Sequence, residues 1–149
     1  MIRAFTGPSQ LTPLQRRWAI LSMLEQPSAD VWRSGAAHGL DTVAARLAIT
    51  LETDLELYVP AANHNETLVR QLAPQATQVI RCPHRATTSD SYRSRNEIMV
   101  TGAVGPRLIE PSDQLQAFVL KPNFYRSGEW MTINIALKRG IEVIKVILP

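Results

Sequence analysis

Three short segments of the sequence carry residue types that could bind an anion or a nucleotide. Residues 35–41, Gly-Ala-Ala-His-Gly-Leu-Asp, combine small side chains with a predicted helix start, so a ligand could approach the backbone and meet free N–H groups. Residues 127–130, Ser-Gly-Glu-Trp, form a second turn of this kind. Residues 93–96, Arg-Ser-Arg-Asn, place two arginines near a predicted helix start, where the helix dipole prefers acids. Such a local misfit points to a functional site.

Each segment also has an ordinary structural interpretation. Asp41 can stabilise the dipole of the helix that follows it, Ser127 can serve as an N-cap, and the two arginines can lie on a solvated face. His38 is predicted to be a loop residue rather than a general base. Tyr125 and Arg126 add a stacking surface and positive charge beside the second turn, which favours binding there.

Strand-like and helix-like runs alternate along the chain and must position these segments. The predicted strands are 2–6, a run from 31 that ends at 34–35, 55–59, 77–81, 115–120 and 142–148. The predicted helices begin at 12 and span about 40–51, 66–72, 92–101 and 128–138. This alternation predicts an α/β fold, a Rossmann-like three-layer α/β/α sandwich with a mostly parallel sheet of about six strands. We expect a single domain over residues 1–149.

Two of the helices carry signals that orient them. Thr12 opens a capping box with a proline at the first helical position, and Leu14, Trp18 and Leu21 then predict one apolar face. Over 40–51, apolar residues recur at i, i+3, i+4, i+7, i+8 and i+11, which predicts a helix with one buried stripe.

The composition favours a cytoplasmic protein with an anionic ligand. The net charge is +3, and arginine, which binds phosphates through paired donors, outnumbers lysine 13 to 3. The lone cysteine, Cys82, excludes an internal disulfide and is predicted to be a buried thiol. No apolar run approaches the roughly 18 residues of a membrane span, and the N-terminus does not look like a signal peptide. No His/Cys cluster has metal-ligand spacing, so we expect no metal, no cofactor and no membrane contact.

The order of the motifs resembles that of the SLOG superfamily. This group includes the Rossmann domain of DNA-processing protein A, the LONELY GUY cytokinin-activating enzymes and sensor domains of bacterial defence systems. Its pattern has a glycine-containing first turn, then GGAxGxDxxA, RNxxM and a glycine turn that opens a helix. The matching segments here are Thr6-Gly7-Pro8-Ser9, Gly35–Ala44, Arg95–Met99 and Ser127-Gly128-Glu129, with Val59-Pro60-Ala61 at the third strand end.

The resemblance implies a ligand site at the carboxyl edge of the sheet, where open parallel sheets bind their ligands. The residues implied are Thr6, Gly7, Pro8, Ser34, Gly35, Ala36, Gly39, Asp41, Pro60, Arg95, Asn96, Ser127, Gly128 and Glu129. Relatives in this group commonly self-associate, so a homo-oligomer is expected by analogy.

Three departures from the family pattern bear on function. Ala36 stands where relatives often have a second glycine, which would restrict how closely a phosphate approaches. Ser9 stands where relatives often carry arginine. The PGGxGTxxE motif of the LONELY GUY hydrolases is missing: Thr132 occupies its glutamate position, and Glu129 lies one turn away. Hydrolysis is therefore disfavoured.

The favoured function is binding of a nucleotide or nucleotide-derived small molecule, by a sensor or a sequestering module. In this hypothesis Ser127, Gly128 and Arg95 hold the phosphate, and Asp41 and Asn96 bond the ribose or base.

Two alternatives remain open. The first is an N-glycosidase or phosphoribohydrolase that uses Glu129 or Asp41 as its carboxylate. The second, less favoured, is binding of nucleic acid in the form of single-stranded DNA. That function would use one stacking ring and four arginines: Tyr92, Arg81, Arg85, Arg93 and Arg95.

Overall fold

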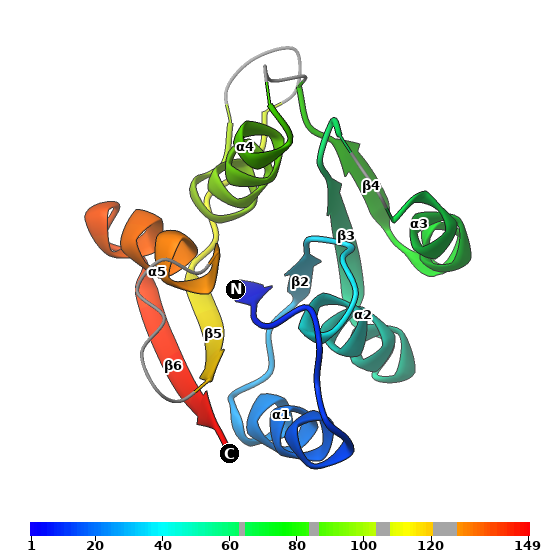
Figure 1. Ribbon diagram of the computed structural model, residues 1–149, viewed down its shortest axis with the longest axis vertical. Coiled ribbons are helices and arrows are strands. Elements are labelled where there is room, and N and C mark those ends of the chain that lie inside the picture. Colours follow the sequence, from blue (N-terminus) through cyan, green and yellow to red (C-terminus); the bar gives the residue numbers. More distant parts are fainter. Residues whose placement is uncertain (63–64, 84–86, 104–107, 121–127) are drawn as a thin grey trace.

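The described residues form six strands and five α-helices that alternate along the chain (Figure 1). The computed structural model describes residues 1–62, 65–83, 87–103, 108–120 and 128–149. The strands are β1 (Ile2–Thr6), β2 (Val31–Ser34), β3 (Asp54–Val59), β4 (Gln78–Arg81), β5 (Gln114–Leu120) and β6 (Glu142–Leu148). The helices are α1 (Pro13–Glu25), α2 (Leu40–Thr50), α3 (Glu66–Leu72), α4 (Thr88–Thr101) and α5 (Gly128–Lys138), with a short 3-10 helix at Ala73–Gln75.

All six strands form one parallel sheet in the order β4-β3-β2-β1-β5-β6. The chain winds outward from β1 to β4 and then returns to β5, on the other side of β1. Helices α1, α2 and α3 therefore cover one face and α4 and α5 the other (Figure 1). This architecture confirms the predicted Rossmann-like α/β/α sandwich. The winding reverses between β1 and β5, where the loops at the carboxyl ends diverge and leave room for a ligand.

The buried stripe predicted for residues 40–51 is largely confirmed. Leu40, Ala44 and Ala48 are at most 1% exposed and belong to the apolar core between α2 and the sheet. Leu51 is 44% exposed because α2 ends at Thr50, one residue before it. A second core fills the opposite face, beneath α4 and α5. No helix within the described ranges has the length and hydropathy needed to cross a membrane.

Cys82 lies in this second core, as the sequence predicted. Its side chain is buried, and burial raises the pKa of the thiol to about 11. A thiol with such a pKa is protonated at neutral pH and is a poor nucleophile.

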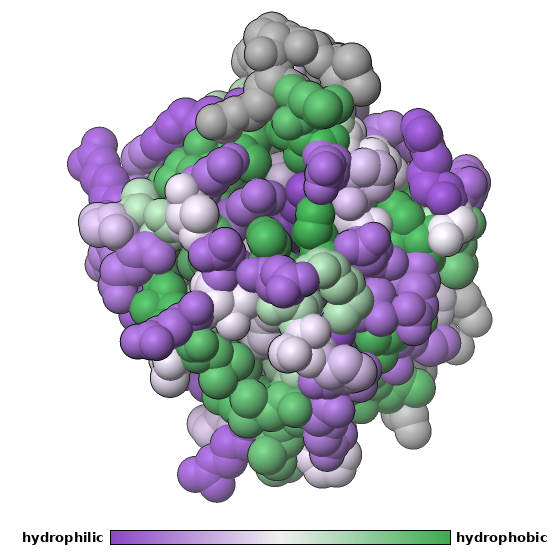
Figure 2. Space-filling model, turned by 180° about the vertical axis from the view of Figure 1, so that it is seen from behind, coloured by the Kyte–Doolittle hydropathy of each residue, from purple (hydrophilic) through white to green (hydrophobic). Residues whose placement is uncertain are grey.

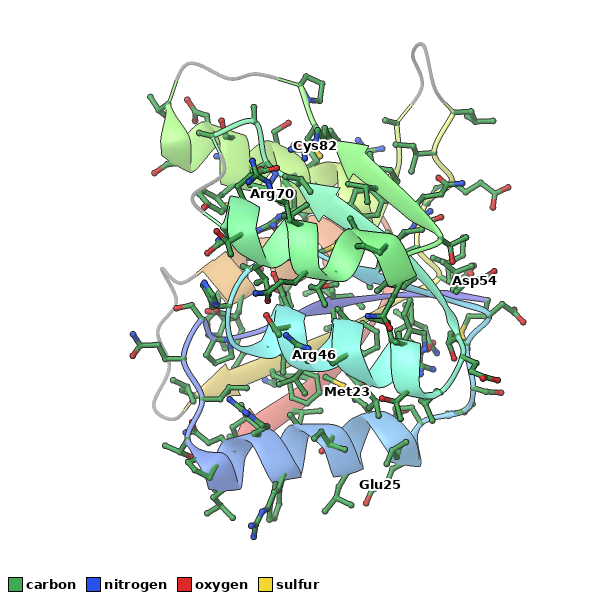
Figure 3. The ribbon with its side chains drawn as sticks, turned by 90° about the vertical axis from the view of Figure 1, so that its right-hand side faces the viewer. Met23, Glu25, Arg46, Asp54, Arg70 and Cys82 are labelled. Atoms are coloured by element: carbon green, nitrogen blue, oxygen red, sulfur yellow. The ribbon has the colours of Figure 1, made fainter. Side chains whose placement is uncertain are left out.

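The apolar face predicted for α1 points away from the core. Thr12 caps the helix in the predicted capping box. Leu14, Trp18 and Leu21, however, are 49–59% exposed, and hydrophobic side chains gather at the lower end of the molecule, where α1 lies (Figure 2). Met23 points from α1 towards the sheet layer instead (Figure 3). The three residues do share one side of the helix, but that side is exposed, and Ala19 and Met23 pack on the sheet instead.

Two arginines are buried inside the sheet region and act as structural cations. Arg33 on β2 pairs with Glu56 (2.8 Å) and donates from Nη1 to the carbonyl oxygens of Met99 (3.1 Å) and Glu110 (2.6 Å). Arg3 on β1 is fully buried. It donates to Gln114 Oε1 and to a backbone carbonyl. These donors tie the second half of the chain to the first two strands.

Candidate functional site

The turn after β1 packs directly on the start of α2. The Leu40 N–H donates to the Pro8 carbonyl (3.0 Å). A Cβ at Gly7 would lie 2.8 Å from Leu40 Cβ, so only glycine leaves room for this approach. Gly39 has φ +78° and ψ −126°, a conformation close to glycine-only, and a Cβ there would lie 2.6 Å from the Ser9 carbonyl oxygen. These two glycines allow the first two predicted motifs to meet.

Two side chains of the site fill the space beside Gly35. A Cβ at this position would lie 2.6 Å from Arg95 Cζ and 2.7 Å from Asp41 Oδ2. The next residue, Ala36, has φ +56°, in the left-handed region that costs a non-glycine residue about 1–2 kcal/mol. Ala36, at the position where relatives often carry glycine, thus has a backbone conformation typical of glycine. Its methyl group is buried in the core.

Arg95 is a buried cation that joins α4 to the ends of β2 and β3. Its Nη1 donates to the carbonyl oxygens of Gly35 and Tyr58, and its Nε donates to Asn96 Oδ1 (2.6 Å). The guanidinium carbon lies 5.3 Å from the centroid of the Tyr92 ring. Within the described ranges, no hydrogen bond joins Nη2 to an acceptor. The sequence did not indicate that most of this side chain serves to organise the site.

Asp41 is a buried carboxyl in the first turn of α2. Its side chain is 9% exposed, and Oδ2 accepts a hydrogen bond from the Ala37 N–H (3.3 Å). Burial raises the pKa of Asp41 to about 6, against the opposing effects of Arg95 and the Ala37 N–H, while Glu129 raises it further. Ser34 holds the backbone here, because its hydroxyl donates to the Asp41 carbonyl (2.8 Å). Asp41 can therefore carry or lose a proton near neutral pH.

These groups open into a cleft of about 270 Å³ at the carboxyl edge of β1. The starts of α2 and α5 both reach it, and a Cβ at Gly128, the first residue of α5, would meet no atom of the described residues within 4 Å. A second hollow of about 250 Å³ shares Ser9 and Glu129 with the cleft and extends over Trp130. The cleft is lined by Phe5, Thr6, Gly7, Ser9, Ala37, His38, Asp41, Tyr92, Arg95, Asn96, Gly128, Glu129 and Met131.

The structure brings together residues from all four predicted motifs, which were far apart in the sequence. Thr6, Gly7, Asp41, Arg95, Asn96, Gly128 and Glu129 line the cleft. Ser34, Gly35, Ala36 and Gly39 shape the backbone around it. Pro8 lines the second hollow, and Pro60 is buried after β3 without lining either one. Ser127, Tyr125, Arg126 and Arg85 lie outside the described residues.

Sequence reasoning missed several residues that line the cleft. Phe5 and Met131 were not singled out, Ala37 was named only as part of the 35–41 segment, and His38 was interpreted as an ordinary loop residue, although it is exposed at the cleft. Tyr92 was assigned only to DNA binding, yet its ring packs on Arg95 in the cleft. Ala37 and His38 lie inside a recognised motif, and the others lie within three residues of one. Proximity to a motif was thus the signal that could have found them.

The cleft combines hydrogen-bond donors with two carboxyl groups. Two helix starts and Arg95 favour an anion, while Asp41 and Glu129 are suited to accept hydrogen bonds from hydroxyl groups. Thr132, at the glutamate position of the hydrolases, is fully buried and its hydroxyl donates to the Gly128 carbonyl (2.8 Å). Within the described ranges, no group of three or more His, Cys, Asp or Glu could hold a metal.

Comparison with solved structures shows what the chain is similar to. Over 95% of this chain and 48% of the other, it superposes on DNA processing protein A from Streptococcus pneumoniae with a TM-score of 0.68 and 17% identity. It also matches DNA processing protein A from Helicobacter pylori, whose structure is described for its single-stranded DNA binding mode, with a TM-score of 0.64 and 17% identity. That match covers 100% of this chain and 65% of the other.

These structural neighbours share the fold of this chain. The chain spans about half to two thirds of their length. No protein-family model matches the sequence, and no curated protein sequence matches it.

The packing of the first turn on α2 predicts unequal effects of alanine at two glycines. Gly39 and Gly140 both have positive φ, which should cost an alanine about 1–2 kcal/mol. Gly39→Ala would also push into the backbone of Pro8 and Ser9, whereas a Cβ at Gly140 meets no atom within 4 Å in the described part of the chain. Urea unfolding should show a clearly larger loss for Gly39→Ala. Equal losses would refute the proposed role of this contact.

Asp41 predicts a pH dependence of stability. An acid whose pKa rises on folding binds its proton more tightly in the folded state, so its contribution to stability falls as pH rises from about 4 to 6. The rise from 3.8 to about 6, at 1.36 kcal/mol per pH unit, amounts to about 3 kcal/mol. Asp41→Asn should remove this fall, so the variant gains stability relative to wild type as pH increases.

The measurement is urea unfolding of both proteins at pH 4, 5, 6 and 7. Comparison of the two proteins cancels titrations that they share. A stability difference that stays constant across this range would show that Asp41 ionises as an ordinary carboxyl.

Proposed function

We propose that the cleft between β1 and β5 binds a nucleotide or a nucleotide-derived small molecule. The observation that carries this proposal is the convergence of two helix starts, a buried arginine and two carboxyl groups at the reversal point of the sheet. Open α/β sheets bind ligands at this point. A nucleotide matches the mixed chemistry, since it presents an anionic phosphate and neutral hydroxyl groups within one small molecule.

The phosphate would lie at the open start of α5. Gly128 has no side chain to fill this space, and the helix offers backbone N–H groups at the positive end of its dipole. Arg95 Nη2 would supply two further donors. The internal bonds of Arg95 fix its guanidinium before the ligand arrives, which reduces the conformational entropy that binding would cost.

The ribose and base would lie towards Asp41 and Tyr92. A carboxylate in this part of a Rossmann-like site suits ribose hydroxyls, which donate hydrogen bonds to it. Asn96 lies beside them, and the half-buried Tyr92 ring offers a face for stacking. The second hollow, over Trp130, gives room for a group larger than one nucleoside monophosphate.

Replacement of Arg95 by alanine should weaken nucleotide binding by about 1.5–3 kcal/mol, the range of a charge-assisted hydrogen bond. Isothermal titration calorimetry with purine and pyrimidine mononucleotides gives the affinities. The matched control is Arg93→Ala, which removes an exposed arginine from the same helix and should leave affinity unchanged. Circular dichroism establishes that the Arg95→Ala variant is folded. Unchanged binding in the folded Arg95→Ala variant would exclude the assigned phosphate site.

The same samples separate binding from turnover. Chromatography after incubation should recover the intact nucleotide. Release of free base that is abolished by Glu129→Gln would instead support an N-glycosidase with that carboxylate, and would contradict a binding module.

Single-stranded DNA is the second candidate ligand, favoured by the fold likeness to DNA processing protein A, one structure of which is described for single-stranded DNA binding. The arginines that the sequence suggested for this function have unequal surroundings. Arg93 is exposed, Arg81 pairs with Glu66 (2.8 Å), and Arg95 is buried. They offer less free positive charge than their number implied.

Fluorescence anisotropy with a labelled oligonucleotide distinguishes the two ligands. If the cleft binds a free nucleotide, the affinity for a mononucleotide should depend little on salt concentration. The labelled oligonucleotide should then bind no more tightly than the mononucleotide. A backbone-binding protein would instead lose oligonucleotide affinity steeply with salt, by roughly 0.7 log units per phosphate contact for each tenfold rise. That result would favour DNA over a small molecule.

A further inference from the structure

Helices α1 and α2 lie side by side on one face of the sheet (Figure 3). A groove of about 330 Å³ runs between them, larger than the nucleotide cleft of about 270 Å³. Small-molecule sites in proteins have volumes of about 300–1,000 Å³, so the groove is large enough for a ligand. This α1–α2 groove is lined mainly by Arg16 and Ile20 of α1 and by Thr42, Arg46, Leu47 and Thr50 of α2.

The charged side chains of the α1–α2 groove are all basic. Arg16 comes from one wall and Arg46 from the other, and the exposed His38 also lines the groove. Within the described ranges, neither arginine side chain forms an ion pair, and no Asp or Glu belongs to the residues that line the groove. A hollow whose charges have one sign concentrates ions of the opposite sign. The groove therefore favours an anion.

The rest of the lining is apolar or already hydrogen-bonded. Ile20 and Leu47 are half-buried and pack against the apolar core, and Val43 beside them is buried. Thr42 and Thr50 donate their hydroxyl hydrogens to backbone carbonyl oxygens, at 2.7 and 2.9 Å. These hydroxyl groups can accept hydrogen bonds from a ligand but have no hydrogen left to donate. The groove thus combines two cations with an apolar surface.

We propose that the α1–α2 groove is a second ligand site, which takes a small organic anion with an apolar body. The anionic group lies between Arg16 and Arg46, and the apolar body covers Ile20 and Leu47. Inorganic phosphate would leave the apolar surface in water, and a neutral hydrocarbon would leave the two arginines without a counterion. A protein partner would need about 800 Å² of surface on each side, far more than this hollow offers.

The second site is separate from the nucleotide cleft. Among the described residues, His38 lines both hollows and the other lining residues differ. The proposal therefore does not depend on the proposed function, and its test uses no nucleotide.

Octanoate is the probe, and 1-octanol is its matched ligand because it has the same carbon chain without the charge. In two-dimensional NMR spectra of the ¹⁵N-labelled chain, octanoate should shift the amide signals of Ile20, Thr42 and Leu47 in a saturable way. The octanol should bind about fivefold more weakly or less tightly still. Equal affinity for the two ligands would overturn the anion site. Shifts confined to the indole N–H of Trp18, on the exposed side of α1, would overturn the location.

Arg46→Gln should weaken octanoate binding by about fivefold, because it removes one of the two cations. The matched control is Arg70→Gln, which removes an exposed arginine of α3 that does not line the groove (Figure 3). It should leave the affinity unchanged. An unchanged affinity in Arg46→Gln, or an equal loss in Arg70→Gln, would overturn the proposal.

Thr50→Glu tests the same site by adding a competing anion. It places a carboxylate four residues from Arg46, on the same side of α2, where the two side chains can pair. Octanoate should then bind more weakly, whereas Thr50→Gln, of the same size without the charge, should bind it as the wild type does. Equal affinities in these two variants would contradict an anion held by Arg46.

Discussion

The candidate site depends on one contact, the guanidinium of Arg95 against the bare backbone of Gly35. Helix α4, on one face of the sheet, places the Arg95 guanidinium in the space that a side chain at Gly35, directly after β2, would otherwise fill. Because the same guanidinium also donates to the Tyr58 carbonyl, it ties α4 to the carboxyl ends of β2 and β3. Asp41 occupies the remaining space beside the glycine. Glycine at one position thus permits charged groups from two distant motifs to share one wall of the cleft.

In this arrangement two charged groups are buried side by side, and the surroundings of each group offset the cost of its burial. Asp41 and Arg95 are each less than a tenth exposed, a costly environment for isolated charges. The arginine offsets its burial by donating to carbonyl oxygens, and the carboxyl by a raised pKa and one backbone N–H. Polar groups that are fixed in this way need little rearrangement to receive a ligand. A strained residue, Ala36, lies at the same turn, as is common at functional sites.

Helix α1 shows how a sequence pattern can be detected correctly and assigned to the wrong surroundings. The spacing of Leu14, Trp18 and Leu21 does form one apolar face, but that face is exposed and Ala19 and Met23 pack on the sheet instead. Periodicity measures whether apolar residues share a side, and it carries no information about what lies opposite that side. In this helix the side opposite the sheet is open to solvent.

The sequence by itself determined the element order, the capping of α1, the buried stripe of α2 and the parallel three-layer class, because these depend on local periodicity and turn chemistry. Its motifs also named most residues that meet at the carboxyl edge of the sheet. Only the tertiary structure decided that Gly35 makes room for Arg95, that Asp41 is buried, and that Tyr92 belongs to the cleft. These features arise between segments up to 60 residues apart, where the distance and solvent exposure of a side chain depend on packing rather than on its neighbours in sequence.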